Sequence, residues 1–229
     1  MSMESRNLSR YERQMVFAPL GLAGQRTLLG RKALIVGVGG LGSWVSELLA
    51  RAGVGLLRLV DDDTVQMSNI HRQAMYDMAD AANGTPKVLA AAQRLRRMND
   101  QTVIETRQDR LTKDNIARLA AGMDLIIDGS DNFAARFLVN DWSVKTGTPW
   151  IFAGVVGAEA QTMTIVPPGA CLRCVSDTPP PPCVDPSCRI AGVLGPAVAA
   201  IAAIEALEAM KILSGNVESA SPYLTKIDL

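Results

Sequence analysis

A short glycine-rich segment between two apolar runs constrains the fold of this chain more than any other feature. The first run begins at Leu34, and the segment after it contains the glycines Gly37, Gly39, Gly40 and Gly42. The second run ends at Asp61, nineteen residues after Gly42. Glycines allow a sharp turn and a close backbone approach to a phosphate, and the N–H groups that begin the next helix attract its charge. The pattern predicts a nucleotide-binding β-α-β unit in which Asp61 accepts hydrogen bonds from a ribose.

Apolar residues alternate between strand-like and helix-like spacing along the first two thirds of the chain. Helical spacing follows the glycines as far as Gly53 and recurs between Pro86 and Asn99. Asn132 is a candidate N-cap for a further helix. Further strands are expected at residues 56–60, 102–106, 124–128 and 150–152. Strands that alternate with helices predict an α/β fold with a doubly wound, Rossmann-like and mostly parallel sheet.

The last third of the chain has a different character. Residues 158–166 read as an extended segment, and residues 167–186 are rich in proline and cysteine, which predicts an irregular, mobile loop. Gly195 opens a long alanine-rich helix that ends before Gly215. Residues 223–229 leave room for a short terminal strand. No repeat or hinge indicates two independent domains.

Composition argues against several classes of protein. Lysine plus arginine and aspartate plus glutamate both total 23, so the net charge of zero gives no global reason to expect nucleic acid or an anionic membrane as a partner. The chain opens without a signal-peptide pattern, and its longest uncharged run, residues 190–204, is too short to span a bilayer. Its cysteines all lie between positions 171 and 188, which indicates a local site and not a disulfide scaffold. A cytoplasmic protein is expected.

Polar motifs surround the glycine segment, and an oxidoreductase would give most of them no purpose. In chain order they are Arg10-Tyr-x-Arg13-Gln14, Asp61-x-Asp63, Ser68-Asn69, Arg72-Gln73, Pro86-Lys87, Asp128-x-x-Asp131-Asn132, Cys171-x-x-Cys174, Cys188-x-x-Ala191-Gly192 and Glu208-Ala209-x-Lys211. This order resembles the ThiF/MoeB/HesA family of adenylyltransferases, the bacterial relatives of ubiquitin-activating enzymes. The resemblance extends from about residue 8 to residue 215.

The resemblance implies an enzyme that uses ATP and Mg²⁺ to adenylate the C-terminal glycine carboxylate of a small ubiquitin-like sulfur carrier. Arg72 and Lys87 would neutralise phosphates, and Asp131 would position Mg²⁺. Arg13 would enter the active site from the other subunit of a homodimer. The residues implied in nucleotide binding are Gly37, Gly39, Gly40, Gly42, Asp61, Asp63, Asn69, Arg72, Lys87, Asp131 and Asn132. A carboxylate is already ionised at neutral pH, so the site would act by positioning and electrostatics, without a general base.

The resemblance also assigns regions to the single domain expected over residues 1–229. Residues 1–30 would form a helical arm, residues 31–155 the nucleotide-binding core, and residues 156–229 the carrier-binding and crossover region. The expected partner is a β-grasp sulfur carrier that ends in Gly-Gly, whose tail would pass beneath a crossover loop near residues 167–187. The thiamine, molybdenum-cofactor and other sulfur pathways all stay open.

The cysteines depart from the family pattern. Cys171 and Cys174 match half of a structural zinc site, but the second C-x-x-C of the family does not occur in this sequence. Two thiolates do not complete a tetrahedral zinc shell. In one interpretation Cys183 and Cys188 supply the other ligands; in another, Cys188 is a catalytic nucleophile that attacks the adenylated carbonyl. Free thiols, a disulfide or a degenerate site are the plain alternatives, so zinc stays open.

Each polar residue also has a plain interpretation. Taken alone, Arg13, Arg72 and Lys87 are typical of solvated surface charges, and Asp131 beside Asn132 is typical of a helix cap. For the whole chain, the alternatives are a relative that adenylates a tRNA base or a peptide carboxylate, an NAD-dependent oxidoreductase, and a binding module without activity. The order of the motifs favours the sulfur-carrier adenylyltransferase.

Overall fold

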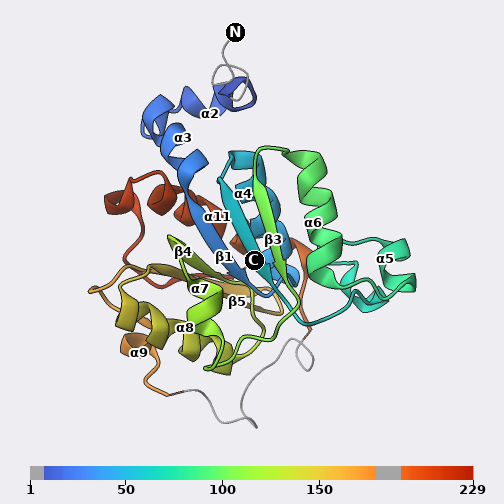
Figure 1. The fold of residues 1–229 in the computed structure, drawn as a ribbon. Coiled ribbons are helices and arrows are strands. Elements are labelled where there is room, and N and C mark those ends of the chain that lie inside the picture. Colours follow the sequence, from blue (N-terminus) through green and yellow to red (C-terminus); the bar gives the residue numbers. More distant parts are fainter. Residues whose placement is uncertain (1–7, 179–191, 229) are drawn as a thin grey trace.

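A seven-stranded sheet forms the centre of the computed structural model, which describes residues 8–178 and 192–228 (Figure 1). The strands are β1 Lys32–Val36, β2 Leu56–Val60, β3 Val103–Arg107, β4 Leu125–Asp128, β5 Trp150–Val156, β6 Glu159–Ile165 and β7 Thr225–Asp228. Their spatial order is β3-β2-β1-β4-β5-β6-β7. Pairing is parallel from β3 to β5 and antiparallel from β5 to β7. This confirms the doubly wound, mostly parallel fold, and the strand order reverses between β1 and β4.

Helices cover both faces of the sheet. The long ones are α3 Gly21–Gly30, α4 Gly40–Ala52, α6 Lys87–Met98, α8 Phe133–Thr146 and α11 Gly195–Leu213. The short ones are η1 Ser9–Tyr11, α2 Glu12–Met15, η2 Met67–Asn69, α5 Met78–Ala82, α7 Ile116–Ala120, α9 Leu172–Val175 and η3 Val217–Ser219. Helices α4, α6 and α11 supply one core cluster, and α7, α8 and α9 supply the other. No helix in the described residues is long and apolar enough to cross a membrane.

The central strand β1 shows why both faces must be covered. Ala33 and Ile35 pack into the cluster with α4 and α11, whereas Leu34 and Val36 pack into the opposite cluster. Side chains alternate between the two faces of a strand, so a continuous apolar run buries residues on both sides. The run that predicted this strand therefore also fixes the layered architecture.

Several element boundaries differ from the expectation. Strand β5 extends to Val156, beyond the expected end at residue 152, because it pairs with β6 as an antiparallel hairpin that turns at Gly157. The expected irregular loop at residues 167–186 contains a helical turn, α9, which Cys171 precedes as its N-cap. Within the described part of residues 1–30, the chain forms η1, α2 and α3, and the assignment of this region as a separate arm stays a prediction.

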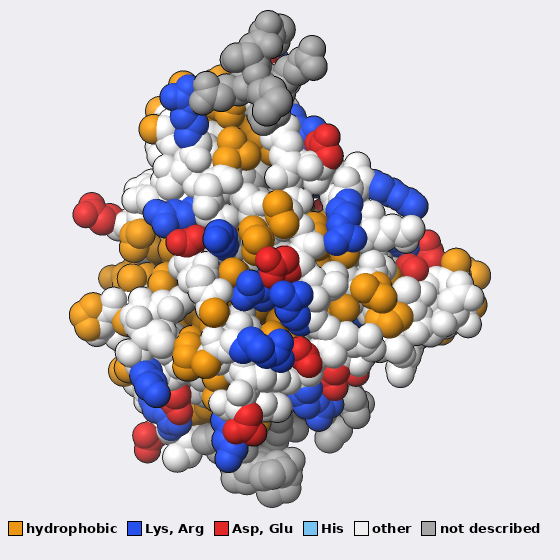
Figure 2. All heavy atoms as spheres, viewed as in Figure 1, with side chains coloured by type: hydrophobic (Ala, Val, Ile, Leu, Met, Phe, Trp, Pro, Cys, Tyr) orange, Lys and Arg blue, Asp and Glu red, His pale blue; other side chains and the backbone are white. Residues whose placement is uncertain are grey.

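The face of the molecule viewed in Figure 2 mixes basic and acidic side chains. Arg58 pairs with Glu105 at 2.8 Å, and Arg118 pairs with Asp109 at 3.1 Å. A surface that binds a nucleic-acid backbone carries clustered positive charge, and this face presents no broad field of one sign.

A buried tyrosine fastens the helical arm to the core. Tyr11 is 1% exposed, and its hydroxyl accepts a hydrogen bond from Asn99 at 2.8 Å. Its ring lies against Gly53, the left-handed residue that ends α4 at φ 88°. A Cβ added at Gly53 would lie 2.5 Å from the ring carbon Cζ. Glycine is therefore required at this position by its backbone conformation and by the close approach of the ring.

We expect Gly53→Ala to destabilise the fold more than Gly147→Ala does. Gly147 also has a left-handed conformation, at φ 75°, but no described atom lies within 4 Å of an added Cβ. Gly147→Ala is the control and should lower the free energy of unfolding by about 1–2 kcal/mol, for the backbone conformation alone. Gly53→Ala should lower it by about 1–3 kcal/mol more, because the added methyl group overpacks against the ring. Urea unfolding of both variants measures the difference. Equal losses would show that the tyrosine contact contributes nothing.

Candidate functional site

One large open cavity lies at the carboxyl ends of the parallel strands, where strand order reverses between β1 and β4. Its volume of about 2230 Å³ exceeds the roughly 300–1,000 Å³ of an ordinary small-molecule site. The walls come from the glycine turn after β1, the segment around η2, the turn between β4 and α8, and parts of β5, β6 and β7. The cavity has room for a nucleotide and for part of a second substrate.

Two glycine turns meet at the floor of the cavity. Gly37 has φ 84°, and a Cβ added there would lie 2.6 Å from the carbonyl oxygen of Gly129. A Cβ on Gly42 would lie 1.9 Å from the carbonyl oxygen of Gly37. These positions exclude any side chain, so the turn after β1 packs directly against the turn after β4. The N-terminus of α4 then faces the cavity without a side-chain cap, which suits a bound phosphate.

Asp61 lies at the end of β2 and holds the glycine turn in place. One carboxylate oxygen accepts from the backbone N–H of Val38 at 2.7 Å, and the other accepts from that of Asp63 at 2.8 Å. Burial raises the pKa of Asp61, and the Lys87 charge and the two backbone N–H groups only partly offset this effect. The sequence predicted a ribose contact but missed this second, structural use of the same carboxylate.

The two predicted phosphate-binding cations line the same cavity. Lys87 is only 6% exposed, and its ammonium donates to Asp63 at 2.8 Å. The Arg72 guanidinium donates to the carbonyl oxygen of Ser68 at 2.8 Å. Lys87 follows Pro86 at the start of α6, and Arg72 follows η2, so distant segments bring the charges together. The plain interpretation of Lys87 as a solvated surface charge is wrong, because the residue is buried.

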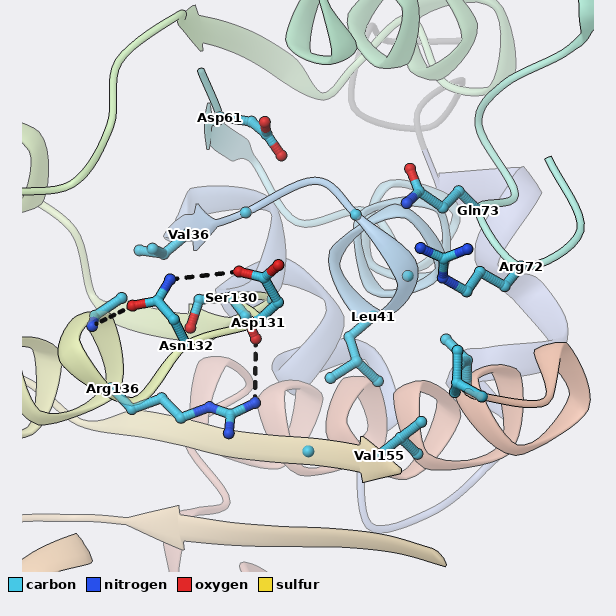
Figure 3. A pocket seen from close by; sticks show the side chains of 18 of the residues that line it. Val36, Leu41, Asp61, Arg72, Gln73, Ser130, Asp131, Asn132, Arg136 and Val155 are labelled. Carbon is cyan, nitrogen blue, oxygen red and sulfur yellow. Dashed lines mark hydrogen bonds between the residues drawn. The ribbon is translucent and has the colours of Figure 1, made fainter. Parts of the chain in front are cut away.

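The predicted magnesium and amide residues occupy the turn after β4. Asn132 accepts from the backbone N–H of Ala135 at 2.9 Å, which confirms its role as the cap of α8. Asp131 is exposed on the cavity wall beside it, 3.4 Å from the Asn132 amide nitrogen (Figure 3). Asn69 also lines the cavity, but its side-chain oxygen accepts from the backbone N–H of Gln66. Asp131, Asn132 and Asn69 thus line the same cavity.

Two cavity residues were not predicted as site residues. Arg136 lies one helical turn after the Asn132 cap and bonds to the buried Asp128 at 3.1 Å. Gln73 is 4% exposed, and its side-chain carbonyl oxygen has no hydrogen-bond partner among the described residues. A buried polar atom without a partner, in a residue of a cavity wall, makes Gln73 a candidate for a contact with water or a ligand. The Arg-Gln pair in the motif was the available signal for Gln73, and the helical spacing after Asn132 was the signal for Arg136.

A third acid lies behind this network. Glu205 of α11 is fully buried, and within residues 8–178 and 192–228 neither carboxylate oxygen has a hydrogen-bond partner. Desolvation raises its pKa well above the ordinary carboxyl value, and the nearby Asp128 charge adds to the rise, while Arg136 opposes it. Burial also raises the pKa of Asp128, whose partners Arg136 and Ser130 lower it in part.

Arg13 is not among the residues that line the cavity of its own chain. It is exposed on α2, in the segment that precedes β1 and lies at the amino ends of the parallel strands (Figure 1). The cavity is lined by residues at the carboxyl ends of these strands.

Cys171 and Cys174 lie apart from the cavity, with their sulfur atoms 3.9 Å from each other. Burial raises the pKa of Cys171, but hydrogen bonds from the Arg173 backbone, the Asn140 amide and Cys174 outweigh it and lower the pKa overall. In the described ranges, no third metal-ligating side chain joins this pair. Cys183 and Cys188 lie outside the described residues, so the local zinc site and the nucleophile both stay predictions.

Comparison with known proteins agrees with this geometry. Residues 11–229 match the model of the ThiF family. The sulfur carrier protein ThiS adenylyltransferase of Bacillus subtilis is 38% identical over 96% of this chain, which spans 65% of that protein, just under two thirds. The Escherichia coli protein of the same name is 39% identical over 93% of this chain and 84% of its own length. The crystal structure of Escherichia coli MccB with ATP superposes with a TM-score of 0.79 at 20% identity, over 96% of this chain and 71% of that one, and shows the fold alone.

We expect Glu205→Gln to become more stabilising, relative to the wild type, as pH rises. Well below pH 4.5, the ordinary pKa of the carboxyl group, the folded and unfolded states both bind the proton. Above that pH the unfolded state releases it while the folded state retains it, so the wild type loses stability until the raised folded pKa is passed. The amide does not titrate and avoids this loss. Melting temperatures between pH 4.5 and pH 8 measure the trend.

Glu208→Gln on the same helix is the matched control. Its carboxylate is buried but accepts from Thr164 and from the Ser221 backbone and pairs with Lys211. The control should lose stability and show no gain that grows with pH. A constant offset for Glu205→Gln would mean that Glu205 is ionised in the folded protein.

Proposed function

The chain belongs to the ThiF family, and we propose that it uses ATP to adenylate the C-terminal carboxylate of a small sulfur-carrier protein. One observation carries the proposal: Arg72, Lys87 and Asp131 line the same cavity as the uncapped start of α4. The curated relatives named as sulfur carrier adenylyltransferases support the choice of reaction.

The cavity residues suit a transfer in which negative charge moves from the attacking carboxylate to pyrophosphate. The α4 N–H groups and Arg72 would bind phosphate oxygens, and Lys87 would exchange its contact with Asp63 for another. The α4 N–H groups are fixed by the fold before the substrate binds, so this part of the site would need little reorganisation as the charge develops. Asp61 would hold the ribose while it continues to fix the glycine turn.

A magnesium ion fits the donor set of the cavity. Asp131 offers an exposed carboxylate, the ligand type that Mg²⁺ prefers, next to the expected phosphate position. When bound, the ion would neutralise and orient phosphate oxygens. Nothing in this chemistry calls for Cys188 or for zinc, and both stay predictions.

The second substrate would occupy the part of the cavity beyond the nucleotide. The wall continues from Gly154 at β5 through Gly157 in the hairpin turn to Lys226 of β7. An extended carrier tail ending in Gly-Gly suits such a groove, because a chain without bulky side chains can lie close to the sheet. Lys226 gives the groove a positive charge that favours an acidic carrier surface or the carboxylate itself.

The alternatives have less support. An NAD-dependent oxidoreductase gives Arg72, Lys87 and Asp131 no purpose and conflicts with the family membership. Adenylation of a peptide remains the second candidate, since the fold is also that of MccB, but that likeness rests on 20% identity. A tRNA substrate lacks a supporting basic surface on the face in Figure 2. The cytoplasmic location, the division into regions and the carrier's pathway stay predictions.

ATP–pyrophosphate exchange tests the proposal. The wild type should exchange label only when a carrier ending in Gly-Gly is present, and Arg72→Ala or Lys87→Ala should slow exchange by about 100-fold or more. Lys145→Ala, an exposed lysine on α8, is the matched control and should leave the rate unchanged. Exchange with short peptides but with no carrier protein would favour the second candidate. Absence of exchange with both would refute the proposal.

We further propose that Arg13 completes the active site of a partner subunit in a homodimer. Arg13→Ala and Asp131→Ala should each be inactive alone. In a mixed dimer, one site combines an intact Asp131 with the partner's intact Arg13. Random mixing in equal amounts should then restore about one quarter of the wild-type rate.

The measurement is ATP–pyrophosphate exchange activity as a function of the ratio in which the two variants are mixed. Arg26→Ala, at an exposed residue of α3, is the control and takes the place of Arg13→Ala. Homodimers of this control should be fully active. No recovery on mixing, despite proven subunit exchange, would place Arg13 outside the active site.

A further inference from the structure

Arg136 is a cation of the cavity wall to which the adenylation chemistry assigns no phosphate contact. Its side chain is 11% exposed and donates to the Asp128 carboxylate at 3.1 Å. It also donates to the backbone carbonyl oxygens of Ser130 at 3.1 Å and of Ala153 at 3.3 Å. Acceptors on β4, on the turn after it and on β5 thus fix one guanidinium, as Figure 3 shows in part.

Aromatic rings hold the same group from two further directions. The guanidinium carbon lies 5.1 Å from the centroid of Phe133 and 5.2 Å from that of Phe152. A planar guanidinium stacks on rings and presents its donors in a rigid fork, which a lysine ammonium cannot reproduce. The orientation of Arg136 is therefore determined by its surroundings and not by the position of a ligand.

Asp128 connects Arg136 to the turn that follows β4. One of its oxygens binds Arg136, and the other accepts from the Ser130 backbone N–H at 2.9 Å and from the Ser130 hydroxyl at 2.5 Å. Ser130 is thereby held through its N–H, its hydroxyl and its carbonyl oxygen. The next residue is Asp131, whose exposed carboxylate makes no contact with Arg136 among the described interactions.

Burying the Arg136–Asp128 ion pair costs desolvation free energy. This cost indicates that the pair has a role beyond stabilising the fold. An ion pair taken out of water seldom stabilises a fold as much as apolar side chains of similar size would. Glu205 lies behind the pair, fully buried, and offers neither oxygen to Arg136 as a competing acceptor. The Arg136 guanidinium therefore donates to Asp128, Ser130 and Ala153.

We infer that the Arg136–Asp128 pair is a positioning device that fixes the Ser130 turn and so places the Asp131 carboxylate for a divalent cation on the nucleotide. The inference rests on the proposed function only in taking Asp131 as the metal ligand. Arg136 acts through Ser130 and is a positioning residue, not a catalytic one. Partners that orient a metal ligand from behind commonly change metal affinity by about 10–100-fold when they are removed.

The test separates metal binding from nucleotide binding. Mn²⁺ replaces Mg²⁺, and electron paramagnetic resonance measures free Mn²⁺ in the presence of the whole protein and a non-hydrolysable ATP analogue. Arg136→Lys should raise the Mn²⁺ half-saturation concentration by about 10-fold or more. Affinity for a fluorescent ATP analogue in EDTA should change by less than about twofold, since Arg136 makes no proposed phosphate contact.

A milder variant and a control accompany this substitution. Ser130→Ala removes only the hydroxyl bond to Asp128 and should raise the half-saturation concentration by a few-fold, about 2–5-fold. It keeps the test decisive if Arg136→Lys does not fold. Arg97→Lys, exposed at the end of α6, is the matched control and should change neither affinity.

The outcomes are distinguishable. Unchanged Mn²⁺ half-saturation in folded Arg136→Lys and Ser130→Ala would overturn the inference and show a purely structural pair. Equal weakening of nucleotide affinity with and without metal would also overturn it, because Arg136 would then bind the nucleotide itself. If the wild type binds Mn²⁺ with the nucleotide but adenylates no carrier or peptide, the proposed reaction fails, and the positioning role is still judged by the Mn²⁺ titrations.

Discussion

The contact between two backbone turns at the strand-order reversal is the constraint on which the rest of the site depends. Gly37 and Gly42 approach so closely that no side chain fits, and Gly129 meets them from the turn after β4. This contact brings the start of α4 beside the start of α8. One turn contributes the uncapped N–H groups, and the other carries Asp131. Without it, the uncapped start of α4 and the Asp131 carboxylate would separate.

Buried acids keep the two turns in place. Asp61 binds the turn after β1 through the Val38 N–H, and Asp128 binds the turn after β4 through Ser130. Each acid lies near one cation, Lys87 or Arg136, that faces the same cavity. Each turn is therefore supported by an acid that also has a cation beside it. A substitution that neutralises one of them would disturb position and electrostatics together.

The fold was largely predictable, because continuous apolar runs and helical periodicity are local signals. The exceptions came from tertiary contacts. β5 extends beyond its expected end because β6 pairs with it. The residues after Cys171 form a helical turn within a segment whose proline content predicted a loop. Among the site residues, motif order gave Arg72, Lys87 and Asp131. It missed Arg136, because a buried ion pair depends on neighbours on other elements.

The sequence by itself determined the α/β class, the glycine turn and the family, since these follow from spacing along one segment or from an ordered set of short motifs. Only the tertiary structure decided that Lys87 is buried against Asp63, that Gln73 has an unpartnered oxygen, and that Arg136 holds the Ser130 turn. It also placed Arg13 away from its own cavity. The reason is physical: burial and hydrogen bonding depend on which distant residues surround a side chain, and one-dimensional spacing does not record that.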